Sequence, residues 1–196
     1  TGVFDEDRYF DVFVEYAKAE PEDILIQITV FNRGPEPAEI HVLPTLWFRN
    51  TWSWREKEEK PELKILSAGT DVRAIAARHR LLGERFLFCE GAVDLLFTEN
   101  ETNTQRIFGV PNRSPYVKDS IDSHVVHGRT EVVNPENRGT KVAAHYRLTV
   151  KPGGTGVIRL RLSPFAPAET ANPFNDFEDV LAVRHNEADE FYAEVI

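Results

Sequence analysis

Hydrophobic and polar residues alternate along most of this 196-residue chain with the period of two that half-buried β-strands show. The first two runs of alternation cover Phe10–Tyr16 and Ile24–Val30, and each is bordered by turn-forming residues. After the turn sequence Asn32–Pro35, alternation resumes over Glu39–Arg49. The connections are too short for helical crossovers, so these three strands are expected to form an antiparallel meander.

Further strands are predicted beyond these three. Apolar runs typical of strands cover Val72–His79, Arg85–Glu90 and Ala92–Thr98. The clearest alternation comes later, over Val142–Val150 and Ile158–Leu162. The turn sequence KPGGTG separates these last two strands, and we expect them to form a hairpin with one buried and one solvated face.

Two regions lack this alternation. The sequence WREKEEKPE, residues Trp54–Glu62, is a run of both charge signs and is expected to form a solvated loop. The span Asn100–Pro135 is rich in Asn, Ser, Gly and Pro. Loops of that length are uncommon inside compact domains and tend to be functional or to pack against another module. This long span is therefore a candidate functional region.

The pattern changes its period at the end of the chain. From Phe177 to Val195, apolar residues recur three and four positions apart, which predicts an amphipathic helix. The predicted fold class is therefore mainly β. We expect antiparallel strands through most of the chain and an amphipathic helix at its end.

Composition and charge narrow the classes of function. Lys and Arg number 23 and Asp and Glu number 32, and the net charge of −9 opposes binding to nucleic acid or to anionic membranes. Cys89 is the only cysteine, and its apolar neighbours predict a buried structural thiol. A disulfide within the chain is excluded, and no apolar run reaches the roughly 18 residues of a membrane span. These features predict a protein of the reducing cytoplasm.

Few motifs of known chemistry occur. The sequence lacks HExxH, CxxC, GxSxG and the glycine-rich loops that bind nucleotides, so we assign no catalytic residue, no metal ligand and no cofactor. His124 and His127 have the spacing of a weak metal pair, but in an extended segment they would point to opposite faces. Asp119 and Asp122 are acidic candidates within the long span.

All three tryptophans lie within LPTLWFRNTWSW, residues Leu43–Trp54. Their indoles have two alternative roles: packing in a core or interface, or forming a platform that stacks on sugar rings. Arg, Asn and hydroxyl residues between them offer the hydrogen bonds that would orient a sugar. The candidate substrate-binding residues are therefore Trp47, Arg49, Asn50, Trp52 and Trp54.

Four long strings of the sequence resemble one known family. They are LPTLWFRNTWSW, SPYVKDSIDSHVVHG, VNPENRGTKVAAHYRLTV and FEDVLAVRHNEADEFY. They are similar to the bacterial glucosidase-like members of glycoside hydrolase family 63. The resemblance implies an N-terminal β-sandwich, an (α/α)6 barrel that carries the catalytic acid and base, and inverting hydrolysis of α-linked sugars.

Under this resemblance the chain comprises only an antiparallel β-sandwich of the supersandwich type over residues 1–170 and a linker helix over residues 171–196. A first residue other than Met and an end at Ile196 inside the helical pattern also favour a piece of a longer protein. The expected partners are the catalytic barrel of the same polypeptide and an α-linked sugar, with the tryptophan stretch and residues 112–128 facing the barrel. The sandwich should then cover only part of the apolar stripe of the helix, formed by Phe177, Leu181, Phe191 and Tyr192.

Two other functions stay open at this point. One is a carbohydrate-binding or interaction sandwich that works alone. A complete small hydrolase would instead use acidic residues of the long span, such as Asp119 and Asp122, held at the separation that glycoside hydrolysis requires.

Overall fold

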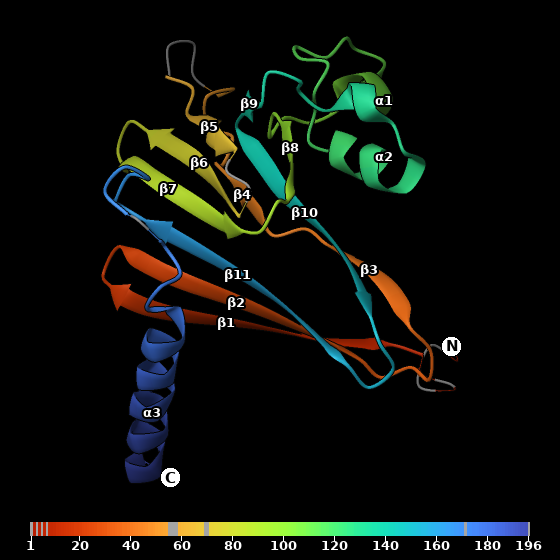
Figure 1. The fold of residues 1–196 in the computed structure, drawn as a ribbon. Coiled ribbons are helices and arrows are strands. Elements are labelled where there is room, and N and C mark those ends of the chain that lie inside the picture. The colour runs from red at the N-terminus through yellow and green to blue at the C-terminus, as the bar shows by residue number, and fades with distance from the viewer. Residues whose placement is uncertain are drawn as a thin grey trace. The chain divides into compact units, whose positions relative to one another are not determined.

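The computed structural model describes residues 2, 4, 6, 8–54, 59–68, 71–170 and 172–195, and Figure 1 shows the chain as a ribbon. The predicted loop Trp54–Glu62 therefore lies in part outside the described residues, as do positions 171 and 196 of the predicted helical segment. The predicted fold class is confirmed, because the described chain is mainly β, with antiparallel sheets and a C-terminal helix.

The chain divides into two compact units. The first unit comprises residues 1–40, 85–91 and 147–196, and the second comprises residues 41–84 and 92–146. Three strands contain residues of both units: β3 (Ala38–Val42), β7 (Gly83–Glu90) and β10 (Lys141–Val150).

The first unit is built on strands that pair antiparallel in the order β1-β2-β11-β7. Their bounds are Phe10–Glu20 for β1, Asp23–Asn32 for β2, Gly83–Glu90 for β7 and Thr155–Ser163 for β11. Alternate residues of β2 and β11 face the same side of the sheet, where Ile28, Val30, Ile158 and Leu160 are buried. The predicted alternation of these strands therefore marks a core face.

The C-terminal helix α3 (Phe177–Val195) packs on the sheet of the first unit through its first turns. Phe177 and Leu181 are buried in one cluster with Ala17 and Leu25. In contrast, Phe191 and Tyr192 are 59% and 58% exposed. The expectation that the apolar stripe of this helix is only partly covered is confirmed.

The second unit contains two groups of paired strands. β6 (Val72–His79), β5 (Glu62–Ala68) and β9 (Arg138–Gly139) pair in the order β6-β5-β9. The first residues of β10 pair on one side with β4 (Thr45–Trp47) and on the other with β8 (Asp94–Thr98). Phe97, Val142 and Ala143 are buried where β8 and β10 meet.

Two predicted strand pairings are wrong. The strand expected over Glu39–Arg49 is divided at Leu43 and Pro44 into β3 and β4, and the meander does not continue because β11 takes the second side of β2. The hairpin expected from β10 and β11 does not form, because β11 pairs with β2 and β7 while β10 pairs with β4 and β8. Alternation specifies which face of a strand is buried, but it does not specify the neighbouring strand.

The long span Asn100–Pro135 has more regular structure than its sequence suggested. It holds α1 (Thr104–Phe108), α2 (Ser120–His127) and the 3-10 helix η2 (Thr130–Val132). His124 and His127 therefore lie on a helix, where positions three apart share a face, and the expectation of an extended segment is wrong.

Candidate functional site

The candidate site begins at the tryptophan turn, residues Trp47–Trp54, which follows β4 in the second unit. Phe48 donates its backbone N–H to the carbonyl of Thr140 at 3.1 Å, which anchors the start of the turn to the strand region. The backbone N–H of Trp54 then donates to the carbonyl of Thr51 at 3.1 Å. These bonds fix the backbone on which the indoles are carried.

The three indoles lie outside the buried core. Trp47 and Trp54 are 54% and 67% exposed, and Trp52 is half-buried. The guanidinium of Arg49 lies 5.4 Å from the ring centroid of Trp54, within the range of a cation–π contact. Of the two alternative roles, core packing within this chain is therefore wrong for Trp47 and Trp54.

Asn50 has a different role from the indoles beside it. Its side-chain amide donates to the carbonyl of Asn100 at 3.2 Å, and its side-chain oxygen accepts the backbone N–H of Ser53 at 3.2 Å. Asn100 in turn donates to the carbonyl of Phe48 at 2.9 Å. These contacts make Asn50 a positioning residue of the turn, since its polar atoms already serve the local backbone.

Trp52 is held by a carboxylate that lies outside the tryptophan turn. Its indole N–H donates to a carboxylate oxygen of Glu101 at 3.1 Å. The ammonium of Lys60 lies 3.4 Å from the same oxygen of Glu101, 2.9 Å from Glu99 and 5.9 Å from the Trp52 ring centroid. The tryptophan turn is thereby connected to a small ionic cluster.

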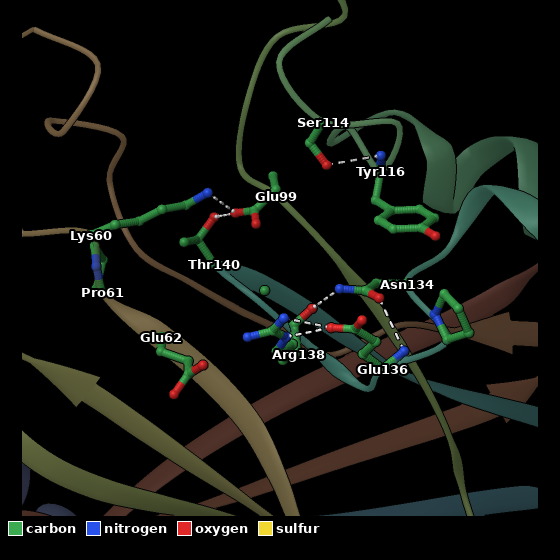
Figure 2. Close-up of a pocket in the computed structure, with 12 residues that line it drawn as sticks. Lys60, Pro61, Glu62, Glu99, Ser114, Tyr116, Asn134, Glu136, Arg138 and Thr140 are labelled. Atoms are coloured by element: carbon green, nitrogen blue, oxygen red, sulfur yellow. Dashed lines mark hydrogen bonds and ion pairs between the residues drawn. The ribbon is translucent and has the colours of Figure 1, made fainter.

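This cluster borders a polar pocket of about 470 Å³ in the second unit. Figure 2 shows the pocket, with Lys60, Glu99 and Thr140 on one side and Asn134, Glu136 and Arg138 on another. Thr140 donates its hydroxyl to Glu99 at 2.7 Å, so Glu99 accepts from both Thr140 and Lys60. Carboxylate, amide, hydroxyl and guanidinium groups therefore converge on one concave surface, as they do in sites for polar small molecules.

Gly139, one of the residues that line the pocket, lies where two backbones approach each other closely. Gly139 lies so near β8 that an added Cβ atom would stand 2.3 Å from the carbonyl oxygen of Thr98. The neighbouring Thr140 donates its backbone N–H to that same carbonyl at 3.1 Å. Only glycine leaves room for this approach, because a Cβ atom at that distance would overlap the oxygen.

Sequence reasoning found the tryptophan turn but missed Lys60, Glu99, Glu101 and Thr140. Glu99 and Glu101 belong to the sequence TENET, residues Thr98–Thr102, which begins at the last residue of the buried strand β8. Acidic residues at a strand end are a usable signal for a polar site. Their link to Lys60 could not be seen, because Lys60 and Thr140 each lie about 40 residues away along the chain.

The acidic candidates of the long span, Asp119 and Asp122, differ in their surroundings. Asp119 accepts hydrogen bonds from the amide of Asn103 at 3.2 Å and from Arg106 at 3.1 Å, which links α1 to the start of α2. Asp122 is exposed on α2. Burial lowers the pKa of the nearby Lys141, with a further contribution from the charge of Lys118.

Three histidines of the second unit come together although their sequence positions are far apart. Nε2 of His145 lies 2.9 Å from Nδ1 of His41, and the rings of His124 and His145 are 6.3 Å apart in an edge-to-face arrangement. Among the residues that the structure describes, no group of three or more His, Cys, Asp or Glu side chains could hold a metal ion.

Cys89 lies in the first unit and is fully buried in β7. Burial raises the pKa of its thiol to about 12, because the thiolate would lose its hydration. The expectation of a buried structural thiol is confirmed.

Comparison with known proteins yields one informative relative. No family model matches the chain. An uncharacterized protein of Saccharomyces cerevisiae, YMR196W, is 30% identical over an alignment that covers 95% of this chain and 20% of the yeast protein. The chain thus spans about one fifth of the length of that relative. Within the described part of the chain, no helix combines the length and apolar character needed to cross a membrane.

Proposed function

We propose that this chain is a non-catalytic β-domain of a longer, inverting α-glycosidase and that its tryptophan turn contacts the sugar substrate. The observation that carries the proposal is the exposure of Trp47 and Trp54 on a turn whose backbone is held by hydrogen bonds. An exposed indole offers a large apolar surface that a ligand can cover, and tryptophan is enriched at interfaces for this reason.

The chemistry around the indoles suits carbohydrate. The apolar C–H face of a pyranose ring stacks on an indole, while its hydroxyls require donors and acceptors nearby. Arg49 lies over Trp54, and the ionic cluster of Lys60, Glu99 and Glu101 connects Trp52 to the polar pocket. Aromatic surface and polar groups therefore occur together within one unit, as sugar binding demands.

The catalytic step is proposed to belong to another part of the polypeptide. Inverting hydrolysis needs a general acid and a general base about 6.5 to 9.5 Å apart across the bound sugar. Glu99 and Glu101 are engaged with Lys60, and Asp119 links two helices. The resemblance to family 63 assigns both groups to a barrel in the same polypeptide, which is the partner we propose for the tryptophan turn. The greater length of the yeast relative is compatible with such a module.

The remaining expectations fit the same proposal. The cytoplasm is the proposed location, because the only thiol, Cys89, is a buried and free cysteine. The net charge of −9 disfavours nucleic acid and anionic membranes as partners, and the proposed activity needs no cofactor.

Titration of the chain with a panel of α-linked gluco- and manno-oligosaccharides, followed by tryptophan fluorescence, tests the proposal. We expect binding that Trp47→Ala and Trp54→Ala each weaken about tenfold or more, equal to about 1.4 kcal/mol. Phe108→Ala removes an exposed aromatic side chain from α1 and serves as the matched control. Unchanged binding in both tryptophan variants would contradict the assignment of the turn.

Two further measurements separate the alternatives. The chain alone should release no sugar from these substrates, whereas the longer parent enzyme should. Turnover by the chain that is abolished by Asp119→Asn would instead support a complete small hydrolase. In the parent enzyme, Trp54→Ala should raise KM, and sugar binding without any parent enzyme would support a sandwich that works alone.

A further inference from the structure

β1 is an edge strand of the first unit, with one side of its backbone not used for pairing. Of the strands that the structure describes, only β2 pairs with β1. In this ladder the carbonyl of Tyr9 accepts the N–H of Arg33 at 3.0 Å, so odd-numbered residues of β1 direct their backbone groups toward β2. The even-numbered residues, including Val12, Val14 and Tyr16, direct theirs away from the sheet. An edge of this kind is a template for another strand.

The side chains of these even-numbered residues are apolar and open to solvent. Val12, Val14 and Tyr16 are 48%, 46% and 71% exposed. They stand on the same face of the sheet as their partners in β2, among which Val30 and Ile28 are buried. The buried face of the sheet therefore continues as an uncovered apolar strip along β1. We name these three residues the β1 strip.

The helix α3 extends past the same edge on the opposite face of the sheet. Near its start, Glu178 pairs with Arg159 of β11 at 2.9 Å, and two turns later His185 lies 2.9 Å from Glu15 of β1. Residues 186–195 continue in the same direction, and Figure 1 shows α3 running beyond β1. They reach about 15 Å farther, the width of about three strands.

We propose that a second copy of this chain pairs with β1, antiparallel and about a two-fold axis at Val14. This register places Val14 opposite itself and Val12 opposite Tyr16, so the two β1 strips form one continuous apolar surface. On the other face it places Phe13 opposite Glu15. The backbone groups that point away from β2 on each copy then meet their counterparts, as hydrogen bonding between the two edges requires.

Charge selects this register over its neighbours. A register centred on Phe13 would place Asp11 opposite Glu15, and one centred on Glu15 would place two copies of that carboxylate together. The register centred on Val14 avoids both repulsions. It spans Phe10–Lys18 and ends before the irregularity that follows Lys18 in β1.

The same register gives the exposed end of α3 a surface to cover. Glu15, where α3 crosses β1, would stand opposite Phe13 of the second copy. Across the sheet of the second copy, Phe13 of β1 pairs with Thr29 of β2, which in turn pairs with Val157 of β11. Phe13 and Val157 are both large, exposed hydrophobic residues. Phe191 and Tyr192 of α3 would therefore pack over these residues of the second copy, and the exchange is reciprocal. The pairing uses only the first unit and does not rest on the proposed sugar site.

Sedimentation equilibrium of the 196-residue chain tests the pairing. The expected mass is twice the monomer mass of 22.4 kDa. Val14→Lys places two like charges at the two-fold axis and should weaken the dimer about tenfold or more, while its circular dichroism spectrum shows that it is folded. Leu82→Lys changes an exposed apolar residue in a turn of the second unit and should leave the dimer intact. A wild-type chain that stays monomeric up to millimolar concentration would overturn the proposal.

Cross-linking tests the register itself. Oxidation of Val14→Cys with diamide should link two chains, because residues opposite each other in a hydrogen-bonded pair are about 5.5 Å apart. Lys18→Cys is the control, since two copies of that residue would be separated by eight positions along the strand, or about 27 Å. Cys89 is buried and should not react. Equal linking of both variants, or none of Val14→Cys, would show that another surface or another strand of a longer polypeptide covers β1.

Discussion

Each of the two units holds a cation between two carboxylates, and the two clusters differ in burial. In the first unit, Arg161 lies 2.6 Å from both Asp23 and Asp176, and the side chain of Asp23 is only 3% exposed. Arg161 also donates to the carbonyl of Pro173 at 2.8 Å. Its hydrogen bonds to Asp23, more than those to Asp176, raise the pKa of this guanidinium. The cluster ties the segment before α3 to β2 and β11.

In the second unit, Lys60 lies between Glu99 and Glu101 but keeps a side chain that is 42% exposed. Its ammonium can therefore exchange a carboxylate contact for a ligand, whereas Arg161 is itself only 11% exposed and is held by the buried carboxylate of Asp23. The comparison teaches that the same pairing of charges supports folding when it is buried and is available for binding when it borders a pocket.

The largest effect should follow from breaking the buried cluster. Arg161→Ala leaves the carboxylate of Asp23 buried without its cation, which should lower the free energy of unfolding by about 3 to 5 kcal/mol. Urea unfolding followed by circular dichroism measures this loss. The double variant Arg161→Met with Asp23→Asn should lose less, because no uncompensated charge remains buried. A single variant as stable as the wild type would contradict the structural role of this cluster.

A second prediction separates the two halves of α3. Leu181→Ala removes a buried side chain and should cost about 2 to 4 kcal/mol of stability. Phe191→Ala changes an exposed residue, and in the monomeric Val14→Lys background it should change stability by no more than about 0.5 kcal/mol. Thermal unfolding of both variants checks this difference. Similar losses would mean that the far half of the helix also packs on its own chain.

The exposed cluster should matter less for stability than for binding. Lys60→Ala removes an ammonium whose side chain is 42% exposed and should cost less stability than Arg161→Ala, although it leaves the carboxylates of Glu99 and Glu101, which are 16% and 14% exposed, without that cation. In the oligosaccharide titration, the same variant should weaken binding several-fold because the cluster borders the pocket and supports Trp52. Lys64→Ala, on the neighbouring strand β5, is the matched surface control. Loss of stability without loss of binding would reverse the comparison between the two units.

The smallest effect concerns Lys141, whose pKa burial lowers, with Lys118 adding to the shift. The folded protein then releases this proton at a lower pH than the unfolded chain, so the unfolded state binds more protons between the lowered pKa and about 10.4. Stability should therefore rise with pH across that window. Unfolding measured from pH 8 to pH 10.5 should show a shallower rise for Lys141→Met than for Lys151→Met, which removes an exposed lysine.

Much of the fold could be predicted because the strands bury one face. The alternation over Ile24–Val30 located β2, and the change of period near Phe177 located α3. Strand partners could not be predicted, since β10 and β11 show similar alternation although they have different neighbours. The helices α1 and α2 were missed because five and eight residues are too few to establish a helical period. Gly109 and Gly128, which end them in the left-handed conformation, were the available signals.

The candidate site was predictable only in part, for a related reason. The tryptophan turn is contiguous in sequence, so its unusual composition was visible. The pocket beside it is assembled from four separate segments that include Lys60, Glu99, Tyr116 and Thr140. Such an arrangement depends on strand order, which local pattern does not encode.

The close approach at Gly139 also constrains how this protein can change over generations. A Cβ atom there would collide with a backbone carbonyl of β8, and a backbone cannot rotate aside as a flexible side chain can. In a saturation library selected for folding, position 139 should therefore retain glycine alone, while the open position Gly91 should admit asparagine or aspartate as well. The polar side chains that line the pocket could then be exchanged over generations, while Gly139 is kept.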